Sequence, residues 1–237
     1  HNMITRMADR RYPEAAVKLT DMRQTLGIFF RALGGDGGLQ VEAADATLNP
    51  AHRSWMQRLA GANTKIHLAW RDQRALRLPP EIAWFDSAAQ NRDLFFWLAA
   101  LGACTDDDTV ANTEWLDQNQ RLTQHVLQRF PGLGPRYQRL VKHHLMQRPD
   151  PQSLNANQAE AERTVRQALT DPGSVSKTSL NKKEIQAVPL WLHPEPPESA
   201  TAKTAHEHSS AQQRSEERRG GAAGGWGGGG GGGGGGG

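Results

Sequence analysis

The feature that most constrains this sequence is an unbroken run of aliphatic and aromatic residues at positions 94–101. A helix that is hydrophobic on every side is stable only where other elements surround it. We therefore predict that this run, in a helix beginning near Asp86, is the central buried element of the fold. The remaining elements are expected to pack around it.

Four more segments place apolar residues three or four positions apart, which is the spacing of an amphipathic helix. In the first, the buried stripe consists of Leu19, Met22, Leu26, Phe29, Phe30 and Leu33. Thr20 or Asp21 is expected to cap the start of this helix, and Gly34-Gly35 to end it. The other three are predicted at about residues 113–130, 135–148 and 155–170, with shorter helical pieces at 2–11 and 52–60.

Three short stretches alternate apolar and polar residues, as half-buried strands do. They are residues 39–43, a stretch with Ile66, Leu68 and Trp70 on one face, and a stretch with Leu76 and Leu78. Residues 71–74 between the last two are polar and suit a hairpin turn. The predicted fold class is α+β: a mostly helical domain with a small antiparallel sheet, followed by a disordered linker.

Composition divides the chain of 237 residues into three parts. Residues 1–170 hold the periodic apolar segments and are predicted to form one α+β domain. Residues 171–219 are rich in proline, serine and charged side chains, and are predicted to be a disordered linker that contains the string VPLWLHPEPP. Residues 220–237 form a glycine-rich, low-complexity tail, which we expect to reflect a frameshift, a fragment end or placeholder residues.

The composition also excludes several classes of protein. No stretch of roughly 18 or more apolar residues is present, so no membrane span is predicted, and the opening HNMITRMADRR lacks the apolar segment of a signal peptide. The single cysteine, Cys104, excludes an internal disulfide and a cysteine-rich zinc site and fits a reducing cytoplasm. The net charge of +3 is too small to indicate nucleic-acid binding by itself.

The motifs that carry catalysis or hold cofactors are incomplete. The glycine cluster at residues 34–38 follows a helix and lacks the lysine of a phosphate-binding loop, so we interpret it as a helix end. His144 falls in the buried stripe of its helix, His206 and His208 lie in the polar linker, and the aspartates at 106–108 lack the spacing of a calcium loop. Cys104 is expected to pack as a small apolar residue. We predict no catalytic residue, metal ligand or bound cofactor in this chain.

Two surfaces are candidates for binding a partner, and the first is basic. Arg136, Arg139, Lys142 and His143, with Arg148 nearby, lie opposite the apolar stripe of their helix. Such a face suits an acidic protein or a phosphate backbone. An ordinary solvated helix face is the simpler interpretation, because no aromatic platform is interleaved with these residues.

The second candidate is the apolar interruption of the linker, formed by Pro189, Leu190, Trp191 and Leu192. A tryptophan flanked by aliphatic side chains is costly to leave in water and too small to form a core of its own. The segment is therefore expected either to fold back onto the domain or to dock into a groove of a partner, and the sequence leaves both alternatives open.

Five strings occur here in a fixed order: RRYPEAAVKL, LGIFFRALGGDGGL, LPPEIAWF, NRDLFFWLAAL and VPLWLHPEPP. Together they resemble the N-terminal region of the CbbO/NorD family over about residues 1–219. The resemblance implies a partnership with a hexameric MoxR-type AAA+ ATPase, which holds the ATP and magnesium. CbbO proteins assist a CbbQ-type activase that frees Rubisco of inhibitory sugar phosphates, whereas NorD proteins are linked to activation of nitric oxide reductase.

The sequence departs from this family in one important respect. Family members carry a C-terminal von Willebrand factor A domain, whose metal-ion-dependent adhesion site uses an Asp-x-Ser-x-Ser motif. The nearest string here, Asp86-Ser-Ala-Ala-Gln90, lacks the second serine. We therefore expect the metal site, and the contact with Rubisco or nitric oxide reductase, to belong to a missing domain, and the chain to be truncated at both ends.

The leading hypothesis from the sequence is a non-catalytic, cytoplasmic adaptor that docks on a CbbQ-like ATPase for Rubisco activation. A NorD-type accessory role in nitric oxide reductase activation is the first alternative. Nucleic-acid binding through the basic face at Arg136 to Arg148 is the second, although the leading hypothesis expects no nucleic acid. An enzyme ranks third, because it has no residues to name.

Overall fold

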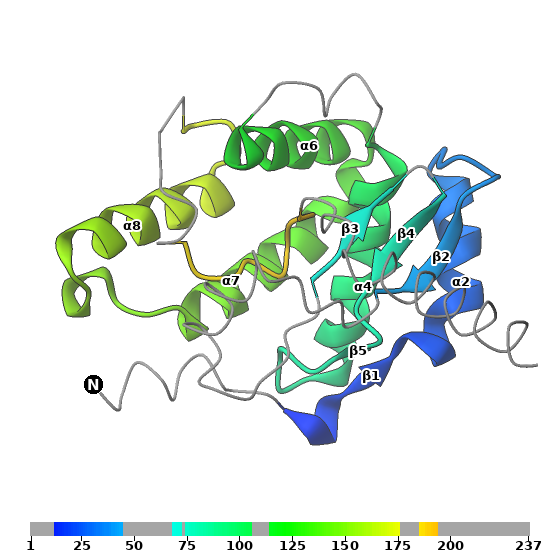
Figure 1. The fold of residues 1–237 in the computed structure, drawn as a ribbon, viewed down its shortest axis with the longest axis horizontal. Coiled ribbons are helices and arrows are strands. Elements are labelled where there is room, and N and C mark those ends of the chain that lie inside the picture. Colours follow the sequence, from blue (N-terminus) through cyan, green and yellow to red (C-terminus); the bar gives the residue numbers. More distant parts are fainter. Residues whose placement is uncertain (1–11, 45–67, 73, 106–113, 176–184, 194–237) are drawn as a thin grey trace, which may run out of the picture. The chain divides into compact units, whose positions relative to one another are not determined.

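The structure is a computed structural model that describes residues 12–44, 68–72, 74–105, 114–175 and 185–193, all of which belong to one compact unit, His1–Pro196. Helix α4, Ala88–Ala103, is its central element (Figure 1). Between residues 94 and 101 every side chain of α4 except that of Phe96 is buried. The helix contacts α2, α6 and α7 as well as strands β1, β4 and β5. The predicted central helix is therefore confirmed.

Helix α2, Leu19–Ala32, begins and ends for different reasons. Its N-cap residue is Lys18 and no side chain caps it, so the prediction of Thr20 or Asp21 is wrong. The amide of Leu19 instead donates to the carbonyl of Pro80 (2.9 Å), so a neighbouring segment satisfies this free donor. At the other end Gly34 has a φ of +91°, and the amides of Gly34 and Gly35 return to carbonyls in the last turn, as predicted.

Three later helices confirm the predictions made from apolar periodicity. They are α6, Trp115–Arg129, α7, Gly134–Gln147, and α8, Ala156–Thr170, within two residues of the predicted limits. Asn155 caps α8, since its side-chain oxygen accepts from the amide of Gln158 (2.9 Å). Short 3-10 helices are η1, Pro13–Ala15, η3, Pro131–Leu133, and η4, Pro151–Ser153. The helical pieces predicted at 2–11 and 52–60 lie outside the described residues.

Within the described residues the strands form two small sheets. β1, Val17–Lys18, pairs antiparallel with β5, Glu81–Ile82. In the second sheet β4, Ala75–Leu78, lies between β2, Gln40–Ala43, and β3, Trp70–Arg71. β3 and β4 are the predicted antiparallel hairpin, and Asp72 stabilises its turn by accepting from the amides of Arg74 and Ala75 (2.6 Å each). β2 runs parallel to β4, a pairing that the alternation pattern alone does not specify.

The sheet packs closely against the central helix. Leu76 and Leu78 of β4 are fully buried, as their predicted shared face requires. A Cβ atom at Gly102 of α4 would lie 2.7 Å from Cδ1 of Leu76, so a larger residue there would force the side chain of Leu76 to shift. The mostly helical α+β class is thus confirmed.

Residues 185–193, here called the strap, form part of the hydrophobic core. In Figure 1 the strap is the orange segment that passes between α7 and β3. Its buried apolar residues are Ile185, Ala187, Val188, Leu190, Trp191 and Leu192. The segment therefore folds back onto the domain, and the core extends beyond the boundary predicted at residue 170.

Candidate functional site

The predicted basic face lies on α7. Tyr137, Leu140, Val141 and His144 are the buried residues of this helix. Because 3.6 residues make one turn, the four predicted binding residues fall on the other side. Arg139 and Lys142 are exposed, and Arg136 and His143 are partly exposed.

A carboxylate of the neighbouring helix contacts this face. Asp93 of α4 accepts from Nε of Arg136 (2.8 Å) and from Nη2 of Arg139 (3.3 Å). Two guanidinium groups thus share one negative charge, and the face keeps a net positive charge. The pairs are partly open to water, so each contributes little to stability, on the order of 1 kcal/mol or less.

Aromatic rings adjoin the basic face, contrary to the prediction from the sequence. The guanidinium carbon of Arg136 lies 5.1 Å from the ring centroid of Phe96 on α4. Phe96 in turn meets Phe29 of α2 edge to face, with centroids 5.0 Å apart. These two rings come from α4 and α2, so the sequence of α7 by itself does not reveal them. We name Phe29, Asp93, Phe96, Arg136, Arg139, Lys142 and His143 together the basic–aromatic face.

Arg148 does not belong to this face, which corrects its grouping with the basic residues. It lies one turn after His144 on the buried side of the chain and is 5% exposed. Its guanidinium donates to both carboxylate oxygens of Glu162 on α8, at 2.8 and 2.7 Å. Arg166 donates to Oε1 of Glu162 as well (2.9 Å), so these three residues form a buried ion network between α7 and α8.

His144 completes the buried network and matches the prediction of a buried histidine with a hydrogen-bond partner. Nη1 of Arg148 lies 3.2 Å from its Nε2. A guanidinium group can only donate, so Nε2 accepts and Nδ1 carries the hydrogen. Within the described residues this Nδ1 has no hydrogen-bond partner. Burial, and then the charges of Arg148 and Arg166, hold the pKa of His144 well below 6.5.

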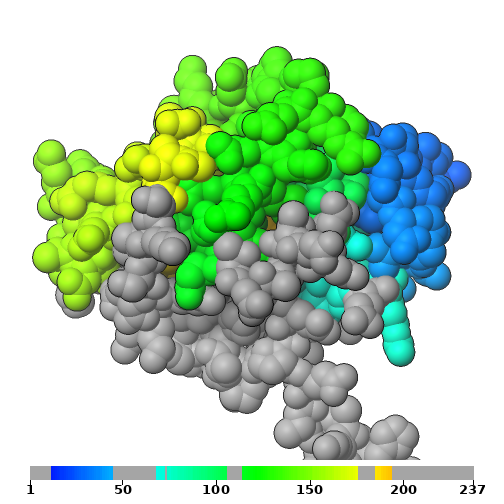
Figure 2. All heavy atoms as spheres, turned by 90° about the horizontal axis from the view of Figure 1, so that it is seen from above, coloured from blue at the N-terminus to red at the C-terminus, as the bar shows by residue number. Residues whose placement is uncertain are grey.

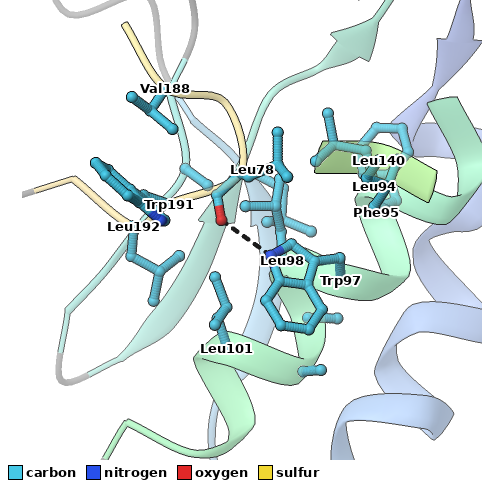
Figure 3. Packing of buried hydrophobic residues seen from close by; sticks show 14 of the residues in the cluster. Leu78, Leu94, Phe95, Trp97, Leu98, Leu101, Leu140, Val188, Trp191 and Leu192 are labelled. Carbon is cyan, nitrogen blue, oxygen red and sulfur yellow. Dashed lines mark hydrogen bonds between the residues drawn. The ribbon is translucent and has the colours of Figure 1, made fainter. Parts of the chain in front are cut away.

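The strap holds the second set of predicted binding residues. Pro189, Leu190, Trp191 and Leu192 are all buried, and Trp191 is 1% exposed. In this arrangement they pack against the core, as Figure 3 shows for Trp191, Leu192 and the side chains around them. A surface for a partner is therefore not formed by these four side chains here, and their predicted role in partner binding stays a prediction.

Polar tips of buried side chains hold the strap backbone. Nε1 of Trp97 donates to the carbonyl of Leu190 (2.9 Å), the dashed line in Figure 3. Nε1 of Trp115 donates to the carbonyl of Leu192 (2.7 Å). The amide side chain of Asn119 bonds both the N–H and the C=O of Leu192, at 2.9 and 3.0 Å. Sequence reasoning missed these anchors; the available signal was Asn119 one turn after Trp115, on the buried side of α6.

The chain just before the strap also contacts α6. Residues 171–175, yellow in Figure 2, lie beside the green α6 on the surface. The amides of Gly173 and Val175 donate to Oε1 of Gln120, at 3.0 and 3.2 Å. These contacts hold the C-terminal side of α8 against α6.

The remaining sequence candidates do not assemble into a site within the part of the chain that the structure describes. Cys104 ends α4 and is buried, as expected for a small apolar residue. No group of three or more His, Cys, Asp or Glu side chains that could hold a metal ion occurs among the described residues. Residues 106–108, His206 and His208 lie outside them. None of the helices described here is long and apolar enough to cross a membrane.

The basic–aromatic face is a candidate surface for binding a partner, and comparison with known proteins shows which proteins this chain resembles. Over 194 residues the chain is 41% identical to Protein NorD of Stutzerimonas stutzeri and 40% identical to an uncharacterized protein of Pseudomonas aeruginosa. It is 37% identical to Protein NorD of Brucella abortus over 146 residues. These relatives support a NorD-like family.

The matches cover more than half of this chain but less than a third of each relative. The match to the Stutzerimonas protein includes 82% of this chain but 31% of that relative, and the match to the Brucella protein 58% and 23%. The chain thus spans about a third or less of the curated relatives it matches. No family model and no solved structure matches the chain.

Proposed function

We propose that this chain is a binding module of a NorD-type accessory protein. The module performs no chemistry itself and docks on a MoxR-type AAA+ ATPase. The observation that carries the proposal is the 41% identity to a protein named NorD over 194 residues. Identity at this level over most of the chain argues for a shared role of this module. The resemblance of five ordered strings to the CbbO/NorD family points the same way.

The target enzyme on this proposal is a nitric oxide reductase rather than Rubisco. The sequence favoured the CbbO role, but relatives that carry the name NorD support the alternative better. ATP is hydrolysed by the ATPase. The target is contacted by parts of the NorD-type protein outside the third of its length that this chain matches. This chain contributes the docking surface.

The proposed docking is tested by coexpressing the chain with its cognate MoxR-type ATPase and measuring the mass of the complex by size-exclusion chromatography with light scattering. We expect the chain to elute with the ATPase hexamer. A folded chain that elutes separately, under conditions where a complete NorD-type protein elutes with the ATPase, contradicts docking by this module.

A chimera tests the choice of target. The chain replaces the homologous 194 residues of the Stutzerimonas NorD protein, and nitric oxide consumption is measured in cells that lack the native protein. We expect the chimera to restore consumption. A chimera that accumulates to normal levels without restoring it contradicts the NorD-type role. Stimulation of a CbbQ-type Rubisco activase by the chain would favour the alternative.

A further inference from the structure

We propose that the basic–aromatic face, extended along α7 by Met146, is the docking surface, and that it binds an acidic amphipathic helix displayed by the ATPase. This inference rests on the proposed function and adds the residues and the chemistry of the contact. Three features of the face support it: the spacing of side chains on α7, the exposure of apolar groups at both ends, and the positive charge.

The side chains form one continuous stripe. Arg136, Arg139, His143 and Met146 follow one another at intervals of three, four and three residues, which places them on one side of the helix. At 1.5 Å per residue the stripe is about 15 Å long. Side chains spaced in this way form a ridge that packs into the groove of a second helix. The length corresponds to about three turns of a bound helix.

Apolar groups lie at both ends of the stripe. Met146 is 61% exposed at one end, and methionine adapts its shape to different partners. At the other end Phe96 and Phe29 are only partly buried, and Arg136 lies over the Phe96 ring. Exposed apolar residues rimmed by charge mark interaction sites. A partner is therefore expected to place one apolar side chain at each end.

The charge of the face favours an acidic protein partner over nucleic acid. Arg92 on α4, Arg139 and Lys142 are exposed, while Asp93 already pairs with Arg136 and Arg139. The surplus is positive, so carboxylates between the two apolar ends complement it. The exposed side chain of Met146 offers a phosphate backbone nothing to bind, whereas an apolar side chain of a protein helix can pack against it. An acidic helix with apolar side chains satisfies both features.

The test measures the affinity of the full chain for the cognate MoxR-type ATPase by biolayer interferometry. The variants are Arg139→Glu, Lys142→Glu and Met146→Glu, all at exposed positions, with Arg163→Glu on the exposed side of α8 as the matched control. We expect each of the three to lower the affinity by about tenfold or more, and the control to change it less than about twofold. Far-ultraviolet circular dichroism checks that all four variants are folded.

The outcomes separate the two proposals. If the wild-type chain binds and the three variants bind as tightly, this face is not the docking surface, although ATPase docking stands. If the wild-type chain does not bind, the proposed function fails, and the inference fails with it. A 20-base-pair DNA duplex serves as a second probe. Tight duplex binding that Arg139→Glu abolishes and Met146→Glu leaves unchanged, with no effect of either on the ATPase, overturns the inference in favour of nucleic acid.

Discussion

Three buried tryptophans meet at the strap, and their indole nitrogens differ. Nε1 of Trp97 and Nε1 of Trp115 each donate to a strap carbonyl, whereas Nε1 of Trp191 has no partner among the described residues. The rings of Trp115 and Trp191 meet edge to face at 5.4 Å. The first two residues therefore position the backbone, and Trp191 contributes through the apolar surface that it buries.

Phenylalanine substitutions separate these two contributions. Trp97→Phe leaves the buried carbonyl of Leu190 without its donor, whereas Trp191→Phe removes no hydrogen bond seen in the described residues. Both remove a similar volume, so we expect Trp97→Phe to cost about 1–3 kcal/mol more in the free energy of unfolding. Urea denaturation measures this difference. Equal costs for the two substitutions contradict the role assigned to the indole of Trp97.

His144 makes stability depend on pH. Its pKa is lowered on folding, chiefly by burial and then by the charges of Arg148 and Arg166, so the unfolded chain binds the proton more readily. The contribution is fully present above pH 6.5 and is lost as the pH falls toward the pKa of the folded state. Between pH 6.5 and the lower pKa of the folded state, we expect protonation of His144 to lower the free energy of unfolding by up to about 1.4 kcal/mol per pH unit.

The pH effect is measured by urea denaturation between about pH 7.5 and about pH 5, a range that includes the pKa of a histidine in the unfolded chain. His144→Gln keeps an acceptor for Arg148 but cannot be protonated, so its stability is expected to depend less on pH. His125→Gln, at an exposed position on α6, is the control and should keep the wild-type dependence. Parallel pH profiles for all three proteins would rule out His144 as the cause.

At the scale of the elements, the strap contributes buried side chains to the hydrophobic core, although the periodicity of the sequence does not predict this. A chain that ends at residue 170 loses several fully buried apolar side chains and exposes Trp97 and Trp115. Burial of one such side chain is worth about 1.5–3 kcal/mol, and domains of this kind are stable by only about 5–15 kcal/mol.

We therefore expect a chain ended at residue 170 to be largely unfolded at 25 °C, as read from its near-ultraviolet circular dichroism. The control ends at Pro196, where the compact unit ends, and keeps the strap. It should keep the wild-type signal. A cooperative thermal transition at the wild-type temperature in the shorter chain would show that the strap is dispensable.

Helices were predictable from this sequence because each carries a local signal. Periodic apolar spacing predicted α2, α6, α7 and α8, and a continuous apolar run predicted α4. The two-residue strand β5 and the parallel pairing of β2 with β4 carry no such local signal. The aromatic part of the basic–aromatic face was missed for the same reason. Phe96 and Arg136 lie 40 positions apart in the sequence, and only tertiary packing brings them together.

At the scale of the whole molecule, segments from both ends of the described chain pack around α4. Leu26 of α2 and Leu190 of the strap are fully buried in the same hydrophobic core. We expect Leu26→Ala and Leu190→Ala each to cost about 2–5 kcal/mol and to lower one shared unfolding transition. Far- and near-ultraviolet circular dichroism during urea titration measure that transition.

Ile28→Ala is the matched control, because Ile28 lies on α2 but is 56% exposed. It should change the free energy of unfolding by less than about 1 kcal/mol. If Leu26→Ala and Leu190→Ala shifted separate transitions, the two segments would belong to independently folding parts.

The position of the strap in the chain also sets the order of events during synthesis. Trp97 emerges from the ribosome 93 residues before its acceptor, the carbonyl of Leu190. At the usual speed of translation this interval lasts on the order of ten seconds. Until the strap emerges, α4, and then α6 and α7 once they have been made, lack the contacts of the strap, and chaperones or proteases have access to that side. We expect the nascent domain to pass quality control only once the last segment of its core has been made.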